Sequence, residues 1–141
     1  MELFKLTHMF YQHHNTVFLE PKHLGYYTSL AEIRKAIAHY RQQPGFAENP
    51  QNFEIVRYNV SDLTASPVYE ALIYWYTEDF ESECSTELGL YARREDAEQV
   101  IRQYRQDNPE LLQVCGEIET EEIVNRYELN RMEWSEGFNF D

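Results

Sequence analysis

The spacing of hydrophobic residues in the first part of the chain predicts two strands, a helix and a third strand. Residues 3–11 alternate partly between apolar and polar side chains, which is typical of a half-buried strand. A second strand, interrupted at Pro21, is expected to end near Tyr27. Apolar side chains then recur at helical spacing over residues 29–43, and a further strand is expected over residues 53–60.

The ends of the predicted helix carry their own signals. Ser29 and Glu32 have the spacing of a capping box, in which the Ser29 hydroxyl accepts from a backbone N–H of the first turn and Glu32 reaches back. Pro44 and Gly45 follow, and this pair cannot extend a helix. The stripe expected to face the core consists of Leu30, Ile33, Ile37 and Tyr40.

The second part of the chain predicts the same order of elements. A strongly β-prone run over residues 68–76 is followed by an acidic loop at 78–87 and a strand at 88–92. A second helix is expected over about residues 93–107, and a last strand over about residues 121–129. Both parts therefore read as strand, strand, helix, strand.

An internal repeat accounts for this shared order. Gly25 matches Gly89 sixty-four positions later, and the triplet Tyr-Arg-Gln at 40–42 recurs at 104–106. Repeats indicate an architecture, because each copy is one supersecondary unit that stacks on its neighbour. The sequence predicts an α+β fold, a pseudo-symmetric tandem ββαβ repeat with largely antiparallel sheets and one helix per unit.

The repeat also suggests where the chain divides. The first repeat is expected over residues 1–60 and the second, strongly acidic repeat over residues 68–141, with a short polar linker at 61–67. A repeat of about 65 residues has a marginal core by itself. The two copies are therefore expected to pack as one compact domain.

Charge is distributed unevenly along the chain. The net charge is −13, yet residues 1–69 are neutral, with six acids and six bases. Residues 70–141 hold nineteen acids and six bases and carry the whole excess. Two copies of one fold do not need different charges, so the asymmetry indicates either solubility or a basic partner. Nucleic acid is not an expected ligand, because phosphate binding requires clustered Lys and Arg.

The cysteines and the apolar runs of the sequence indicate the cellular compartment in which the protein is expected. Cys84 and Cys115 are the only cysteines, and they have neither a metal-ligand spacing nor the number of a disulfide framework. The first residues lack the basic and apolar regions of a signal peptide, and no run approaches the length of a membrane span. We therefore expect a cytoplasmic protein with free thiols and no membrane contact.

Several motifs resemble a family of small uncharacterised bacterial proteins. Residues 25–58 carry a Gly-x-Tyr-Thr-Ser helix start, similar to the family's Gly-x-Tyr-Ser-Ser, followed by a Pro-Gly-Phe turn and a strand. Residues 134–138 carry the terminal Trp-x-x-Gly-Phe, so the pattern is split between the two repeats. The resemblance implies an α+β fold and a bacterial origin. The family has no assigned activity, so it implies no catalytic residues.

Catalytic and metal-binding patterns are missing from the sequence. It has no Gly-x-Ser-x-Gly, no Gly-rich phosphate loop and no calcium-loop pattern in its acidic stretch. No two histidines have the spacing of one helical turn, so strand or turn positions are expected for them rather than a metal. The histidines are His8, His13, His14, His23 and His39. We expect neither an enzyme nor a cofactor.

Acids and aromatics together predict a binding surface. If the second sheet brings them together, they form an anionic surface with aromatic anchors. The predicted partner-binding residues are Glu78, Asp79, Glu81, Glu83, Glu87, Glu117, Glu119, Glu121, Tyr74, Tyr76 and Trp134. Such a surface is typical of an inhibitor of the bacterial immunity or antitoxin kind, which neutralises a basic toxin, for example a nuclease, without catalysis.

Two other functions stay open. The chain is alternatively a structural or regulatory interaction module, a monomer or a homodimer joined at an exposed strand edge, with its acids present only for solubility. A third reading is a module that binds a small molecule or metal through its histidines and tyrosines. The sequence does not distinguish among the three.

Overall fold

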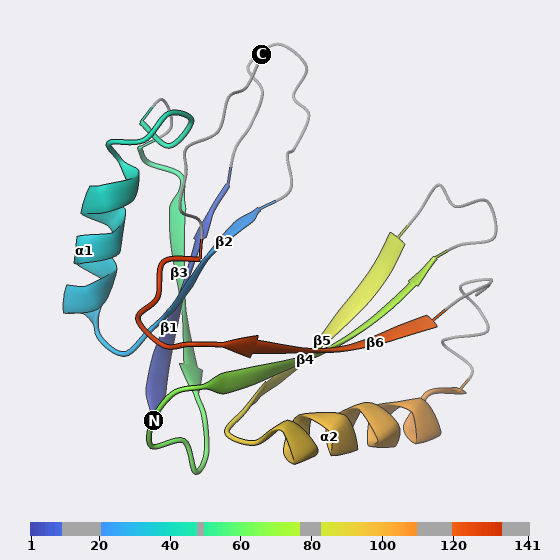
Figure 1. Ribbon diagram of the computed structural model, residues 1–141. Helices are drawn as coiled ribbons and strands as arrows, with labels where there is room; N and C mark the ends of the chain where they lie inside the picture. The colour runs from blue at the N-terminus through green and yellow to red at the C-terminus, as the bar shows by residue number, and fades with distance from the viewer. Residues whose placement is uncertain (10–20, 48–49, 77–82, 110–119, 134–141) are drawn as a thin grey trace. The chain divides into compact units, whose positions relative to one another are not determined.

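The computed structural model describes residues 1–9, 21–47, 50–76, 83–109 and 120–133, and it contains two sheets and two helices there (Figure 1). The strands of the first half are β1 (Glu2–His8), β2 (Lys22–Tyr27) and β3 (Phe53–Asn59), with α1 (Leu30–Tyr40) before β3. Those of the second half are β4 (Val68–Tyr76), β5 (Glu83–Tyr91) and β6 (Thr120–Tyr127), with α2 (Arg94–Asp107) before β6.

Both sheets are antiparallel and three-stranded, which confirms the predicted α+β tandem arrangement. Their strand orders are β2-β1-β3 and β5-β4-β6, so the first strand of each repeat is central. The registers correspond: Leu6 lies opposite Gly25 and Ile55, and Ala71 lies opposite Gly89 and Val124.

Two boundaries differ from the prediction. β5 begins at Glu83 and not at residue 88, so the expected acidic loop is wrong over residues 83–87. Glu is depleted in strands, and here pairing of Glu83 and Glu87 with β4 overrides that preference. α1 ends at Tyr40, short of residue 43, and the chain continues in tight turns in which Gln43 N donates to Tyr40 O at 2.9 Å.

The glycines of the repeat occupy the same bulge in the two sheets. Gly25 has φ +120° and Gly89 has φ +123°, each beside a shift in register. L-residues rarely adopt this conformation, whereas glycine does so without steric cost. Beyond each bulge a tyrosine hydroxyl donates back to the leucine carbonyl three residues earlier, over 2.7 Å in the first sheet and 2.9 Å in the second.

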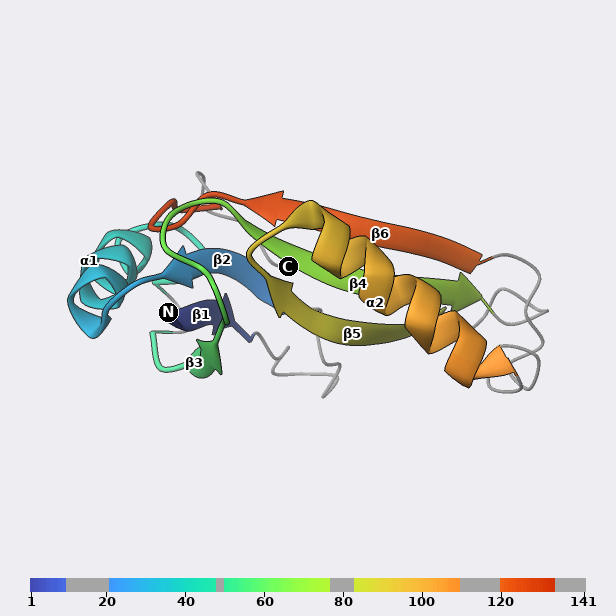
Figure 2. The same ribbon diagram turned by 90° about the horizontal axis from the view of Figure 1, so that it is seen from below.

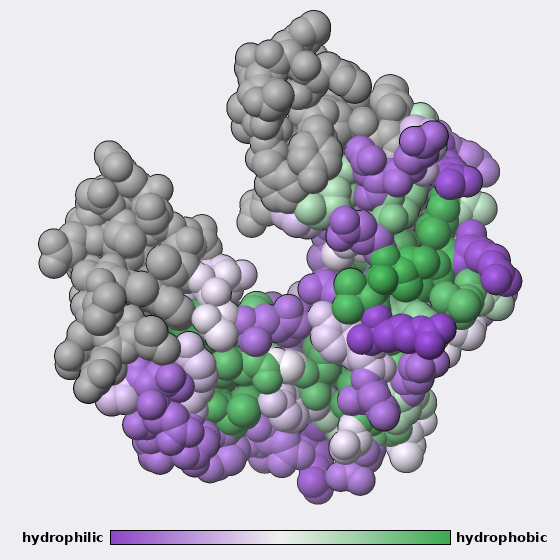
Figure 3. All heavy atoms as spheres, turned by 180° about the vertical axis from the view of Figure 1, so that it is seen from behind, coloured by the Kyte–Doolittle hydropathy of each residue, from purple (hydrophilic) through white to green (hydrophobic). Residues whose placement is uncertain are grey.

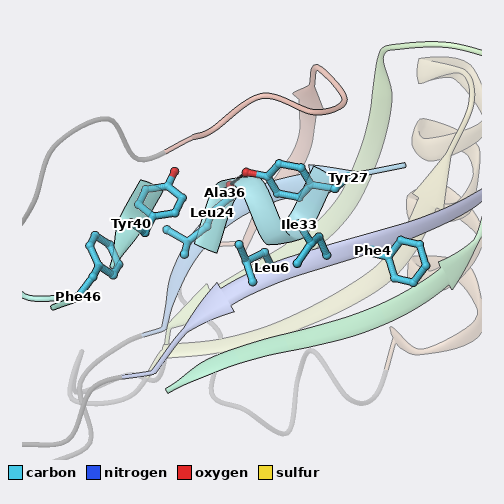
Figure 4. Packing of buried hydrophobic residues seen from close by; sticks show 8 residues of the cluster. All are labelled: Phe4, Leu6, Leu24, Tyr27, Ile33, Ala36, Tyr40 and Phe46. Atoms are coloured by element: carbon cyan, nitrogen blue, oxygen red, sulfur yellow. Dashed lines mark hydrogen bonds between the residues drawn. The ribbon is translucent and has the colours of Figure 1, made fainter. Parts of the chain in front are cut away.

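The first core lies between α1 and the sheet of β1 and β2 (Figure 4). Ser29 caps α1 by accepting from Glu32 N at 3.2 Å, which confirms that half of the predicted capping box. The carboxylate of Glu32 instead pairs with Lys35 at 3.3 Å. The buried cluster consists of Phe4, Leu6, Leu24, Tyr27, Ile33, Ala36, Tyr40 and Phe46.

The second core is smaller, and α2 covers it across the sheet of β4, β5 and β6 (Figure 2). Ala71 and Ile73 of β4 are fully buried against Ala97 and Ile101 of α2. Arg93 precedes this helix and makes no side-chain cap.

The chain forms two compact units, and each contains most of one repeat. The first unit consists of residues 1–59 and continues at residue 128, and the second consists of residues 60–127. The segment after β3 therefore belongs to the second unit, and the segment after β6 belongs to the first. Each repeat contributes the stretch that follows its last strand to the unit of the other repeat.

We call residues 128–133 the strap, and they lie along β2 in the first unit (Figure 1). Asn130 N donates to Tyr26 O at 2.8 Å, and Glu133 N donates to Leu24 O at 3.4 Å. Asn130 has φ 59°, a conformation that asparagine tolerates, and its side-chain oxygen accepts from Thr28 N at 2.9 Å. The strap thus covers the outer edge of β2.

Candidate protein-binding face

The alternation of β4 separates two faces of the second sheet. Ala71 and Ile73 point toward α2, so Leu72 and Tyr74 point to the opposite side. Residues directly opposite in an antiparallel sheet share a face. The register therefore decides which side chains of β5 and β6 join Leu72 and Tyr74.

Acidic and apolar side chains lie together on this side. Leu72 lies opposite Glu87 of β5 and Ile123 of β6, and Tyr74 lies opposite Glu121 of β6. The next pairing adds Leu90 and Asn125 on either side of Glu70. We define the acidic face as the side of the second sheet opposite α2, formed by Glu70, Leu72, Tyr74, Ser85, Glu87, Leu90, Glu121, Ile123 and Asn125.

Exposure differs among these residues in a way that suits binding. Glu87 and Glu121 are exposed, while Leu72, Tyr74 and Ile123 are half-buried between them. Solvated carboxylates thus flank apolar and aromatic area that a partner can cover.

Glu70 is the exception, because it is only 5% exposed at the centre of the sheet. Asn125 Nδ2 donates to its carboxylate at 3.2 Å, and a buried acid requires such partners. Glu70 therefore stabilises the arrangement of β4 and β6 rather than presenting its charge.

Three of the predicted site residues are brought together on the acidic face: Tyr74, Glu87 and Glu121. Glu83 and Tyr76 lie opposite each other in the register of β4 and β5. The other predicted site residues lie outside the described part of the chain, and these are Glu78, Asp79, Glu81, Glu117, Glu119 and Trp134.

Sequence reasoning missed the aliphatic part of this face. Leu72, Leu90 and Ile123 provide its apolar area, and Glu70 its buried carboxylate. Alternation along 68–76 contains the signal, since every second residue from Val68 belongs to one side. The bulge at Gly89 hides the matching signal in β5, because it shifts the register there by one residue.

The helical side of the second unit has a more balanced charge. α2 contains four acids and three arginines, whereas the whole second unit contains sixteen acids and five bases. Arg105 pairs with Glu122 of β6 at 2.6 Å, and the guanidinium of Arg94 lies 5.3 Å from the ring of Tyr69. Of the excess of eleven negative charges in the unit, α2 itself therefore carries only one.

The described histidines have structural surroundings. His8 is 1% exposed and packs edge-on against Phe46 and Phe53, with ring centroids 4.8 Å away in each case. Burial, with a smaller contribution from Lys5, lowers the pKa of His23 from 6.5 to about 4, so this ring is neutral at physiological pH. No group of three potential metal ligands occurs within the described ranges.

Neither helix in the described residues is long and apolar enough to cross a membrane.

Comparisons with other proteins found no relatives. No protein-family model, curated protein or solved structure matches the chain. The acidic face therefore has to be interpreted from its own chemistry.

Proposed function

We propose that this protein is a non-enzymatic inhibitor of the bacterial immunity or antitoxin kind, which binds and neutralises a basic toxin, for example a nuclease. The observation that carries the proposal is the placement of Glu87 and Glu121 around Leu72 and Tyr74 on the side of the sheet away from α2. A rigid sheet holds these side chains in a fixed arrangement, which favours recognition of one partner.

The two kinds of side chain have different roles in such a complex. Exposed carboxylates attract a basic protein and raise its rate of association, and this effect weakens as salt is added. Tyr74 and the neighbouring aliphatic side chains supply area that is desolvated on contact and slows dissociation. A nuclease presents a cationic groove to its nucleic acid, and an acidic face of this kind competes for that groove.

The proposal is tested by capture of a partner at low and at high salt. The bait is the full chain, and the prey is the lysate of the source organism together with the product of the adjacent gene. A stoichiometric basic protein that salt releases, and whose toxic activity the full chain suppresses, is the expected result. A partner that is indifferent to salt, or a chain that leaves the toxic activity unchanged, would contradict the proposal.

A homodimeric interaction module is the second candidate, and the outer edge of β3 favours it. Figure 3 shows hydrophobic residues at the surface of the first unit. On β3, Ile55 is 44% exposed and Val56 is 46% exposed, although both are β-branched residues that normally pack. α1 packs mainly against β1 and β2, whereas α2 also packs against β6. The edge strand β3 is therefore less covered by its helix than β6 is.

Edge strands of this kind pair with other chains. In this second candidate, sedimentation at high protein concentration shows a dimer, and Val56→Lys returns it to a monomer. A wild-type chain that stays monomeric at high concentration rejects the homodimer.

A further inference from the structure

Four of the five bases in the second unit lie where α2 and β6 meet. Arg94 and Arg102 of α2 line a recess between the two elements, and Arg105 is paired to β6. Arg126 of β6 lies opposite Tyr69, on the side of the sheet that packs against α2. Because the unit also contains sixteen acids, this gathering of positive charge indicates a negatively charged ligand.

The recess has a volume of about 380 Å³, which is within the size range of sites for small molecules. Its lining combines apolar and charged side chains, namely Arg94, Glu98, Ile101, Arg102, Glu122 and Val124. Glu122 is already paired with Arg105 at 2.6 Å. Two guanidinium groups and the carboxylate of Glu98 therefore remain for a ligand.

Both guanidinium groups of the recess are held in place by neutral neighbours. The guanidinium carbon of Arg94 lies 5.3 Å from the centre of the Tyr69 ring. Arg102 donates to Gln99 Oε1 from Nη2 at 2.7 Å and from Nε at 3.3 Å. Neither arginine makes an ion pair with a described residue, although Glu98 is four positions from each, a spacing at which such pairs form on a helix. The two positive charges are therefore oriented but not neutralised.

The positions of these groups along α2 define the ligand. Arg94 and Arg102 are eight residues apart, which corresponds to about 12 Å along the helix axis, so a ligand with two anionic groups matches them better than one with a single group. Glu98 is half-buried between them and accepts from a donor, such as an ammonium group. Ile101 and Val124 suit a short hydrocarbon chain between the two ends.

We propose that the recess between α2 and β6 binds an acidic amino acid, which is a small dicarboxylate that carries an ammonium group. One carboxylate binds the Arg94 guanidinium beside Tyr69. The second carboxylate binds Arg102, and the ammonium group binds Glu98. The recess is on the α2 side of the sheet and the acidic face is on the other side, so the inference goes beyond the proposed function and does not depend on it.

The test is a titration of the full chain, labelled with ¹⁵N, at constant ionic strength. The probes are L-glutamate, glutarate, which lacks the ammonium group, and L-2-aminobutyrate, which lacks the second carboxylate. We expect L-glutamate to shift the amide signals of residues 98–102 and 122–124, which line the recess. Each of the two analogues should bind at least about tenfold more weakly than L-glutamate.

Substitutions in the recess test the role of each charge. Glu98→Gln removes both the acceptor of the ammonium group and the repulsion of the carboxylates, so it should weaken binding of L-glutamate and strengthen binding of glutarate. Arg102→Gln should weaken binding of both probes at least about tenfold. Arg93→Gln is the matched control, because Arg93 pairs with Asp96 at 3.1 Å and does not line this recess. It should leave both affinities within about twofold of wild type.

Three results would overturn the proposal. The first is no shift at residues 98–102 with about 10 mM L-glutamate. The second is equal binding of the three probes, since the recess would then attract any anion. The third is an equal loss of affinity in Arg93→Gln and Arg102→Gln, since only net charge would then matter. The titration contains no toxin, so its failure leaves the inhibitor function standing, and failure of partner capture leaves the titration result unchanged.

Discussion

Substitution of the two corresponding glycines by alanine separates the contribution of the strap from that of the bulge. A Cβ at Gly25 would collide with the carbonyl oxygen of Arg131 in the strap, and it would lie 3.1 Å from the Tyr27 hydroxyl oxygen. A Cβ at Gly89 would meet only the ring of Tyr91, with the hydroxyl oxygen at 3.2 Å. Gly89→Ala is therefore the matched control for Gly25→Ala.

The magnitude follows from what each variant loses. Both carry the strain of a positive φ, which costs roughly 1–3 kcal/mol and cancels in the comparison. Gly25→Ala also displaces the strap, whose hydrogen bonds to Tyr26, Thr28 and Leu24 contribute about 1 kcal/mol each at most. These bonds are partly exposed to water, so we expect Gly25→Ala to lower the free energy of unfolding by about 2 kcal/mol more than Gly89→Ala does.

The assay is urea unfolding of the full chain, followed by amide hydrogen exchange. In Gly25→Ala, the amides of Asn130 and Thr28 should exchange much faster than in the wild type, because displacement of the strap breaks the hydrogen bonds from Asn130 N to Tyr26 O and from Thr28 N to Asn130 Oδ1. In Gly89→Ala, these two amides should keep their wild-type rates. Equal destabilisation by the two variants, with unchanged exchange at Asn130, would show that the strap does not lie on β2.

Further predictions concern single groups. As the pH falls from 6.5 to 4, unfolded His23 takes up a proton and folded His23 does not. The free energy of unfolding should therefore fall by up to about 3 kcal/mol over this range on acidification. His23→Asn should flatten this pH dependence, measured by urea unfolding. Ser29→Ala removes the cap of α1 and should cost about 1 kcal/mol in thermal unfolding. Burial and, to a lesser extent, the negative charge of Asp96 raise the pKa of Tyr91, so an ultraviolet titration should show one late tyrosine fewer in Tyr91→Phe.

Local sequence signals were sufficient for the repeated architecture. The alternation and helical periodicity of each half gave the element order, and the match of Gly25 to Gly89 identified two positions with the same backbone. These features depend on residues close in sequence, which is where such signals are reliable. The prediction of an acidic loop was wrong over residues 83–87, because these residues form a strand through pairing with β4, which local sequence does not encode.

The strap had no signal of its own. Residues 128–133 mix charged, polar and apolar side chains without a period, and their bonds are mostly from backbone N–H groups, which every residue except proline has. Part of the acidic face was predicted from the sequence, since the concentration of acids and aromatics pointed to Tyr74, Glu87 and Glu121. Its aliphatic residues became identifiable only through the register, which the bulge shifts.

The most direct test of the inhibitor function is calorimetric binding of the captured toxin to two charge-reversed variants. Glu87→Lys/Glu121→Lys changes the acidic face, and Glu95→Lys/Asp107→Lys changes the net charge equally on exposed positions of α2. We expect the first variant to bind at least about 30-fold more weakly, or about 2 kcal/mol, and the second to bind within about threefold of wild type. Equal loss of affinity in both variants would show that only the net charge of the protein matters. Unchanged affinity in the first variant would show that the acidic face is not part of the interface.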